Sequence, residues 1–130
     1  MGIIMNIRYI LLKHTNEIEI KTAKLTNNLF DELSSQIGEK GEVKPTKNIE
    51  GVYIMYDDFL GSDFSEEDFL RAYNPNASLF SNTDEYGDCI LCKIEPFDYE
   101  NEEDWEGNHI DDITDDEITK ITDIIKAEGF

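Results

Sequence analysis

The residues of this chain that could perform chemistry are two cysteines, two histidines and a large excess of acids. Cys89 and Cys92 have the spacing of a CxxC motif, which in other proteins binds zinc or forms a redox pair. A zinc site needs four ligands, and the chain has no second CxxC motif. Both cysteines also lie in a segment with the composition of a strand, where residues three apart point to opposite faces. We therefore expect core or edge cysteines here rather than a metal or redox site.

The histidines and glycines also fail to complete a known catalytic or metal-binding pattern. His14 and His109 are the only histidines, and neither belongs to an HExxH or HxxxH spacing. An EF-hand loop needs alternating acids, a central glycine and a final glutamate. With Gly107 as the central glycine, Ile113 occupies the place of that glutamate. The chain also lacks a nucleophile elbow and a phosphate-binding loop, so we predict no enzyme and no cofactor.

The acids are concentrated in the C-terminal part of the chain. Residues 1–48 contain 7 bases and 6 acids (+1), residues 49–130 contain 4 bases and 24 acids (−20), and the sum is −19. Such a field repels nucleic acid and acidic lipid and attracts basic proteins or cations. We therefore expect a basic protein as the partner, and neither direct nucleic-acid binding nor membrane binding.

One tract contains half of these C-terminal acids. Between Ile94 and Thr119 there are 12 acids and no Lys or Arg, and Tyr99 and Trp105 lie among them. Solvated acidic tracts are poor in aromatic residues, whereas protein interfaces favour Trp and Tyr. Two interpretations stay open, a solvated acidic loop and a protein-binding face. The residues predicted to bind the partner are Asp98, Tyr99, Glu100, Glu102, Glu103, Asp104, Trp105, Glu106, Asp111, Asp112, Asp115, Asp116 and Glu117.

The N-terminal half predicts the elements of a small sheet. An apolar run over Ile3–Leu12, a polar turn at residues 14–16 and alternation after Ile18 predict a β-hairpin. We expect its first strand to be central and the charged side of its second strand, with Glu19 and Lys21, to face solvent. A helix is predicted from a cap at Thr26 to Gly38, then a loop over residues 39–48 and a strand over residues 52–56.

The C-terminal half predicts two more helices and one more strand. A short helix begins at Ser65 and ends at Asn74-Pro75, and a strand covers residues 86–94. An acidic loop over residues 97–112 follows. Thr114 to Glu117 forms the capping box of a last helix with an isoleucine stripe. We predict a single α+β domain over residues 1–130, a mostly antiparallel four-stranded sheet with two or three helices in the order ββα-β-α-β-α.

The layout resembles an uncharacterised domain family found largely in phage and mobile-element proteins. The matching parts are the opening hairpin, the helix that ends at Ile37-Gly38, Asn74-Pro75-Asn76-Ala77, Tyr86-Gly87-Asp88, and Ile113 to Ile118. The paired glycines that follow the first helix in the family are replaced here by Gly38-Glu39-Lys40-Gly41. No activity is attached to this family, so the resemblance implies a phage or plasmid origin and assigns no site residues.

A small acidic protein of this origin is similar in kind to anti-defence proteins. We therefore predict an inhibitor that docks its acidic face on a basic nucleic-acid-binding host protein, a CRISPR or restriction nuclease. Mimicry of DNA by the acidic face is one way in which it could do so. Two alternatives stay open: an immunity protein or antitoxin against a basic toxin, and a module that binds a small ligand or a divalent cation. The apolar start is broken by Asn6 and Arg8 and has no cleavage site, so we expect a cytoplasmic protein of the bacterial host.

Overall fold

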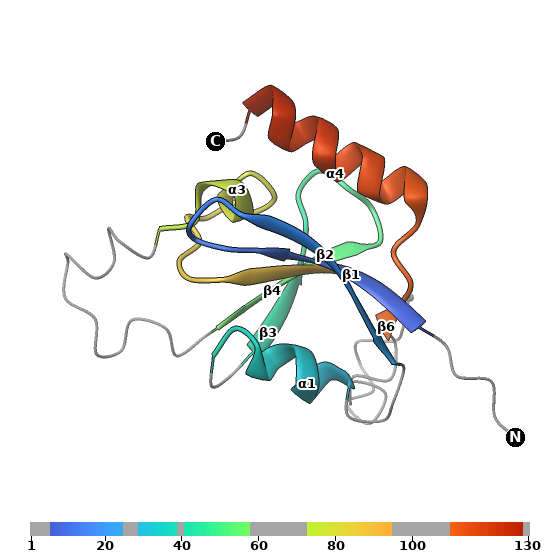
Figure 1. The fold of residues 1–130 in the computed structure, drawn as a ribbon. Helices are drawn as coiled ribbons and strands as arrows, with labels where there is room; N and C mark the ends of the chain where they lie inside the picture. Colours follow the sequence, from blue (N-terminus) through green and yellow to red (C-terminus); the bar gives the residue numbers. More distant parts are fainter. Residues whose placement is uncertain (1–5, 25–28, 39–40, 58–72, 95–109, 129–130) are drawn as a thin grey trace, which may run out of the picture.

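A computed structural model describes residues 6–24, 29–38, 41–57, 73–94 and 110–128 of the chain. Its elements, in chain order, are β1 (Asn6–Leu12), β2 (Ile18–Lys24), α1 (Leu29–Ser35), β3 (Gly41–Pro45), β4 (Val52–Asp57), α3 (Pro75–Ser78), β5 (Cys89–Ile94), β6 (Ile110–Asp111) and α4 (Asp115–Glu128). The strands form one sheet in the order β2-β1-β5-β4-β3, and β6 pairs with β5 outside this path (Figure 1).

Every strand pair in this sheet is antiparallel, which confirms the α+β class and the antiparallel pairing. The prediction of four strands was too low. Residues 41–45, assigned to a loop, form β3, and Ile110 and Asp111, assigned to the acidic loop, form β6. A proline weakens a strand prediction but is tolerated on an edge strand, and Pro45 is the last residue of β3 at the sheet edge.

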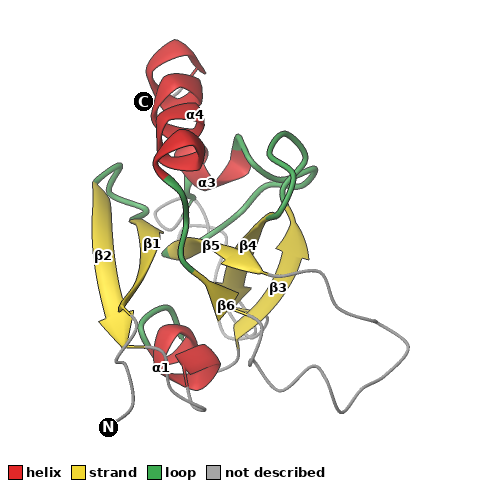
Figure 2. Cartoon of the chain, turned by 90° about the vertical axis from the view of Figure 1, so that its right-hand side faces the viewer, coloured by secondary structure: helices red, strands yellow, loops and turns green. Residues whose placement is uncertain are grey.

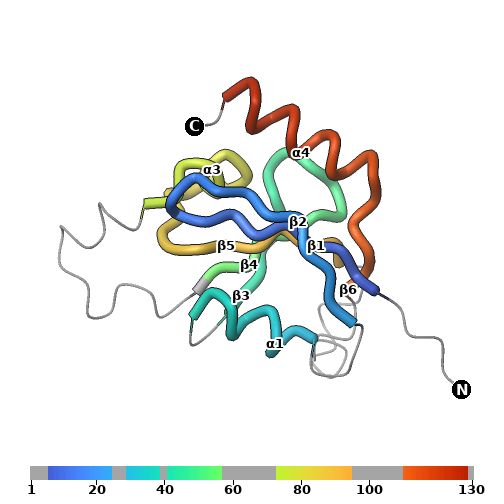
Figure 3. The backbone as a smooth tube through the Cα atoms, in the orientation of Figure 1, coloured from blue at the N-terminus to red at the C-terminus, as the bar shows by residue number. Residues whose placement is uncertain are grey.

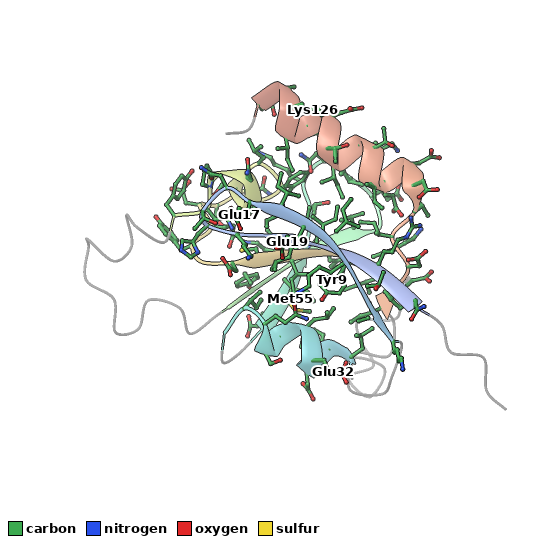
Figure 4. The ribbon with its side chains drawn as sticks, in the orientation of Figure 1. Tyr9, Glu17, Glu19, Glu32, Met55 and Lys126 are labelled. Carbon is green, nitrogen blue, oxygen red and sulfur yellow. The ribbon has the colours of Figure 1, made fainter. Side chains whose placement is uncertain are left out.

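Helices cover both faces of the sheet, with α4 and α3 on one face and α1 on the other (Figures 1 and 2). Alternate residues of β1 and β5 therefore enter two separate cores. Ile10, Leu12 and Leu91 belong to the core on the α4 side. Tyr9 and Met55 belong to the core on the α1 side, where Figure 4 shows them between the sheet and the helix.

The opening hairpin is confirmed for the residues described, and its first strand is central, between β2 and β5. Asn16 has a φ of 72°, so it supplies the left-handed residue of the turn. The predicted orientation of β2 was wrong. Glu19 and Lys21 are half-buried on the α1 side, and Ile18 and Ile20 are exposed. The register decides this, because Ile20 lies opposite Ile10 at the edge of the α4 face.

Both long predicted helices are present. Leu33 of α1 and Ile37 in the turn after it are buried as the helical spacing predicts, although α1 ends at Ser35 rather than at Gly38. The cap predicted at Thr26 lies outside the described residues. The α4 capping box is formed: the Thr114 backbone N–H donates to Glu117 Oε1 (2.9 Å), and the Glu117 N–H donates to Thr114 Oγ1 (3.2 Å). Ile121 and Ile125 of α4 pack on the sheet. No helix in the described ranges is long and apolar enough to span a membrane.

Asn74 has the opposite role to the one predicted for it. The helix predicted from Ser65 lies outside the described residues, but Asn74-Pro75 begins a helix, α3, instead of ending one. Asn74 is fully buried, and its Oδ1 accepts from the Ala77 backbone N–H (3.0 Å). Its Nδ2 donates to the carbonyl oxygens of Leu12 and Gly87, at 2.8 Å each. One side chain therefore joins α3, the end of β1 and the segment before β5.

Candidate functional site

The structure describes five of the thirteen residues predicted to bind a partner. Eight lie outside the described residues: Asp98, Tyr99, Glu100, Glu102, Glu103, Asp104, Trp105 and Glu106. The other five lie close together, on β6, on the turn after it and on the first turn of α4. We call these five the β6–α4 acids: Asp111, Asp112, Asp115, Asp116 and Glu117.

The sheet determines where the undescribed acidic segment is attached. The chain leaves β5 at Ile94 and re-enters the sheet at Ile110, and these two residues lie opposite each other in antiparallel register. Ile94 and Ile110, the described residues that flank residues 95–109, therefore lie side by side at one end of the sheet, next to the β6–α4 acids. We call this place the β6–α4 corner.

Two of the β6–α4 acids bind Arg8 of β1. Asp112 Oδ1 accepts from the Arg8 backbone N–H (2.7 Å) and from Arg8 Nε (3.1 Å), and Asp112 Oδ2 lies 3.1 Å from Nη2. Asp115 Oδ1 accepts from Nη1 at 2.5 Å. The side-chain hydrogen bonds from Arg8, and the charge of its guanidinium, lower the pKa of Asp112.

This contact has a structural cause. β1 pairs with β5 only over Ile10 to Leu12, so the backbone of Arg8 has no partner on β5. The carboxylate of Asp112 accepts the Arg8 N–H, and the Ile113 N–H donates to the Arg8 carbonyl oxygen at 3.4 Å. The chain after β6 thus fills the gap that β1 leaves in the sheet.

Glu117 is buried, and besides the capping box it has one further partner, Lys93. Its Oε1 lies 3.3 Å from Lys93 Nζ of β5 and accepts the Thr114 backbone N–H. Burial raises the pKa of Glu117, but the hydrogen bonds from Thr114 and the charge of Lys93 lower it more, so its pKa lies below the usual value. Glu117 is therefore an ionised residue that stabilises the start of α4.

The remaining two acids are less constrained. Asp116 is exposed on α4, and half-buried Asp111 accepts the backbone N–H of Asp112 at 2.7 Å. The five acids with Arg8 and Lys93 leave a local charge of −3 (five negative, two positive). The corner therefore attracts cationic groups even after its internal ion pairs are counted.

The other described residues that could perform chemistry, two cysteines and one histidine, lie in the core or in a turn. Cys89 lies in the α4-side core and Cys92 in the α1-side core, as predicted for residues three apart on a strand. Burial raises the pKa of both thiols, that of Cys92 to about 12. His14 lies in the hairpin turn, with Nδ1 2.9 Å from Asp88 Oδ1. Among the residues described, no three His, Cys, Asp or Glu side chains gather as a metal site would require.

Sequence reasoning missed one buried ionic network. Glu85 is 5% exposed, and its Oε1 accepts from Lys44 Nζ, from Ser81 Oγ (2.7 Å) and from Thr83 Oγ1 (3.1 Å). The same Lys44 Nζ lies 4.7 Å from the centroid of the Tyr56 ring. The network attaches residues 78–86 to β3, so its role is to hold the fold. A lone Lys in β3 gave no indication of which acid it would pair with.

Arg8 and Lys93 were missed for the same reason. Each is a single base within an apolar strand, which predicts a carboxylate partner but does not identify it among 30 acids. Arg8 pairs with an acid 104 positions away.

No protein-family model, curated protein or solved structure matches this chain.

Proposed function

We propose that this protein binds a basic, nucleic-acid-binding protein and blocks the surface on which that protein holds nucleic acid. A nuclease of a bacterial defence system is the target we favour, on the expectation that the chain has a phage or plasmid origin. The observation that carries the proposal is the separation of charge, −20 over residues 49–130 against +1 over residues 1–48. Solubility needs a net charge of only about 2 to 8 in a small domain.

The described geometry supports a preformed anionic surface at the β6–α4 corner. Asp112 is held by Arg8, so its carboxylate loses little freedom when a partner binds. Glu117 is only 8% exposed and is held by Lys93, so it adds charge to this surface rather than a direct contact. The side chain of Asp115 is 89% exposed and contacts Arg8 at the surface, where a base of the partner can reach it. Asp116 is exposed beside it. These residues offer carboxylates on a rigid strand and helix rather than on a free tail.

The size of the charge suits a nucleic-acid channel. Duplex DNA has one charge per about 1.7 Å of axis, so the 12 acids between Ile94 and Thr119 match the charge of roughly six base pairs. Complementary charge speeds association and makes it sensitive to salt. Tyr99 and Trp105 are proposed as apolar anchors that slow dissociation, and they lie outside the described residues.

The test is affinity capture with competition. The immobilised protein is exposed to lysate of the bacterial host at about 0.05 M and 0.5 M NaCl, which spans weak and strong screening. We expect one basic nucleic-acid-binding protein to be retained at low salt, to stay in part at high salt, and to be displaced by duplex DNA. Release of many basic proteins together by salt would mean a generic polyanion and would overturn the proposal.

Matched charge variants locate the face. One variant has Asp98, Glu102, Glu103 and Asp104 changed to Lys. The control has four exposed acids elsewhere changed to Lys: Asp31, Glu32, Glu50 and Asp84. Figure 4 shows Glu32 on the outer side of α1, away from the sheet. Both variants change the net charge equally, so loss of capture in the first alone supports the placement. Equal loss in both would contradict it.

A basic toxin encoded beside this gene would favour the immunity-protein alternative instead. The same acidic surface would serve that function, because a toxin with a nucleic-acid channel presents the same chemistry. Capture of a toxin that DNA does not displace would separate this alternative from channel occlusion.

A further inference from the structure

The strand β2 lies at one edge of the sheet and carries two exposed isoleucines. It pairs with β1, and no other described strand lies along its second edge (Figures 2 and 3). Ile20 is 54% exposed and Ile18 is 37% exposed on this strand. An open edge with exposed branched apolar residues is a template for pairing with another strand.

The hairpin turn shows which backbone groups of β2 are available. The Lys13 N–H donates to the Glu17 carbonyl oxygen at 2.9 Å, so this pair is a hydrogen-bonded one. In an antiparallel pair such positions alternate, so residues 19, 21 and 23 direct their N–H and C=O groups toward β1. The N–H and C=O groups of Ile18, Ile20 and Thr22 therefore point outward.

The side chains of β2 divide between the two faces of the sheet. Ile18 and Ile20 lie opposite Leu12 and Ile10, which belong to the α4-side core. The two β2 isoleucines are therefore on the α4 face of the sheet, but they remain exposed there. Glu19 and Lys21 are half-buried on the α1 face. There Lys21 Nζ donates to Gln36 Oε1 at 3.3 Å. Each face of the strand thus has its own chemistry, apolar on one side and charged on the other.

We propose that β2 pairs with β2 of a second copy of this chain, antiparallel and about a two-fold axis at Ile20. In this register Ile20 faces its counterpart, Ile18 faces Thr22, and Glu19 faces Lys21, each pair occurring twice except the central one. The three outward-facing residues of each strand then form about six backbone hydrogen bonds. The two sheets become one continuous sheet across the interface.

Charge complementarity selects this register and this partner. A shift that places the axis at Lys21 brings two lysines face to face, and a shift to Glu19 brings two glutamates face to face. Among the residues of β2, only the register about Ile20 places an acid opposite a base on both sides of the axis and brings no like charges face to face. The β1–β2 hairpin, residues 6–24, also has four bases and two acids, so its charge of +2 contrasts with the acidic remainder of the chain. Electrostatic repulsion between two copies of the chain is therefore weakest at the β2 edge.

The test is the mass in solution, measured by sedimentation equilibrium over a range of protein concentrations. We expect a dimer of the 15.0 kDa chain that dissociates on dilution. Glu19→Lys and Lys21→Glu each replace two opposite-charge pairs with two like-charge pairs. Each single change is expected to raise the dissociation constant about tenfold. The double variant Glu19→Lys with Lys21→Glu restores both pairs in the same register, so its dissociation constant returns toward that of the natural chain.

Circular dichroism of each variant controls for the fold, because Glu19 and Lys21 also contact Lys13 and Gln36 within the chain. A chain that stays monomeric at the highest concentration overturns the proposal. A dimer that responds equally to both single changes and to the double change also overturns it, since its interface then lies elsewhere. The inference does not depend on the proposed function, because it concerns the opposite, non-acidic half of the chain.

Discussion

Replacing Asn74 by alanine removes three hydrogen bonds from the interior. Asn74 is fully buried, and the change leaves the carbonyl oxygens of Leu12 and Gly87 without the donor they have at 2.8 Å. Each buried group left unsatisfied costs about 1–3 kcal/mol, and loss of the α3 cap adds about 1 kcal/mol. We expect Asn74→Ala to lower the free energy of unfolding by about 3–7 kcal/mol, against a total of about 5–15 kcal/mol for a domain.

Asn74→Asp has the same shape and a different charge, so it tests the reasoning more sharply. Above its pKa the new carboxylate presents an acceptor to two carbonyl oxygens and has no proton to donate. Burial and these carbonyls raise its pKa in the folded protein above the unfolded value of about 3.9. The folded state then binds the proton more tightly, so the penalty is complete above the folded pKa and declines as the pH falls through it.

Urea unfolding followed by far-ultraviolet circular dichroism, at several values between about pH 4.5 and pH 8, measures both effects. Asn74→Asp should be less stable than Asn74→Ala at the upper end and should gain on it at the lower end. Asn74→Ser serves as a control, because a serine restores the cap acceptor and neither long-range donor. A loss below about 1 kcal/mol for Asn74→Ala, or an Asn74→Asp penalty independent of pH, would refute the assigned role.

Three further predictions concern the α4 cap, the core and the thiols. Glu117→Gln should cost about 0.5–1.5 kcal/mol at pH 7 by removing the ion pair with Lys93. Because the pKa of Glu117 is lowered, its contribution is present above about pH 4.3 and is lost as the pH falls through the folded pKa, so the two proteins should converge in acid urea titrations. Phe80→Ala should cost about 3–5 kcal/mol in the same titration, since Phe80 is fully buried in the α4-side core; a smaller loss would mean that the site collapses around the cavity. Cys89 and Cys92 should resist a thiol reagent at pH 8 and react together in urea, because burial raises the pKa of both, and fast reaction of the folded protein would contradict their placement.

Local patterns in the sequence were sufficient for the elements that depend on near neighbours. The polar turn between an apolar run and an alternating segment predicted the β1–β2 hairpin, and the spacing of Thr114 and Glu117 predicted the capping box of α4. The opposite faces of Cys89 and Cys92 followed from the strand period alone. These features involve residues a few positions apart, so their physical cause is visible in the order of the chain.

The sequence predicted which part of the chain holds the candidate site, but it did not predict how the side chains of that site are paired. The sequence determined that the acids are concentrated after Asn48, which sets the sign of the partner's charge. It did not show that Asp112 is held by Arg8, because this pairing arises only where β1 separates from β5. A base in a strand requires a carboxylate, but the choice among many acids is made by the path of the chain.

The tertiary structure alone decided which side of β2 is covered and which groups Asn74 binds. The alternation in β2 is equally compatible with either face pointing to solvent. The register places Ile20 opposite Ile10 at the edge of the α4 face, where the isoleucines of β2 remain exposed. Asn74-Pro75 was interpreted as a helix stop, yet the Asn74 side chain caps the start of α3 and also donates to the carbonyl oxygens of Leu12 and Gly87, which are distant in sequence. Period and capping are properties of the chain, whereas burial and long-range pairing exist only after strands separated in sequence have been placed side by side.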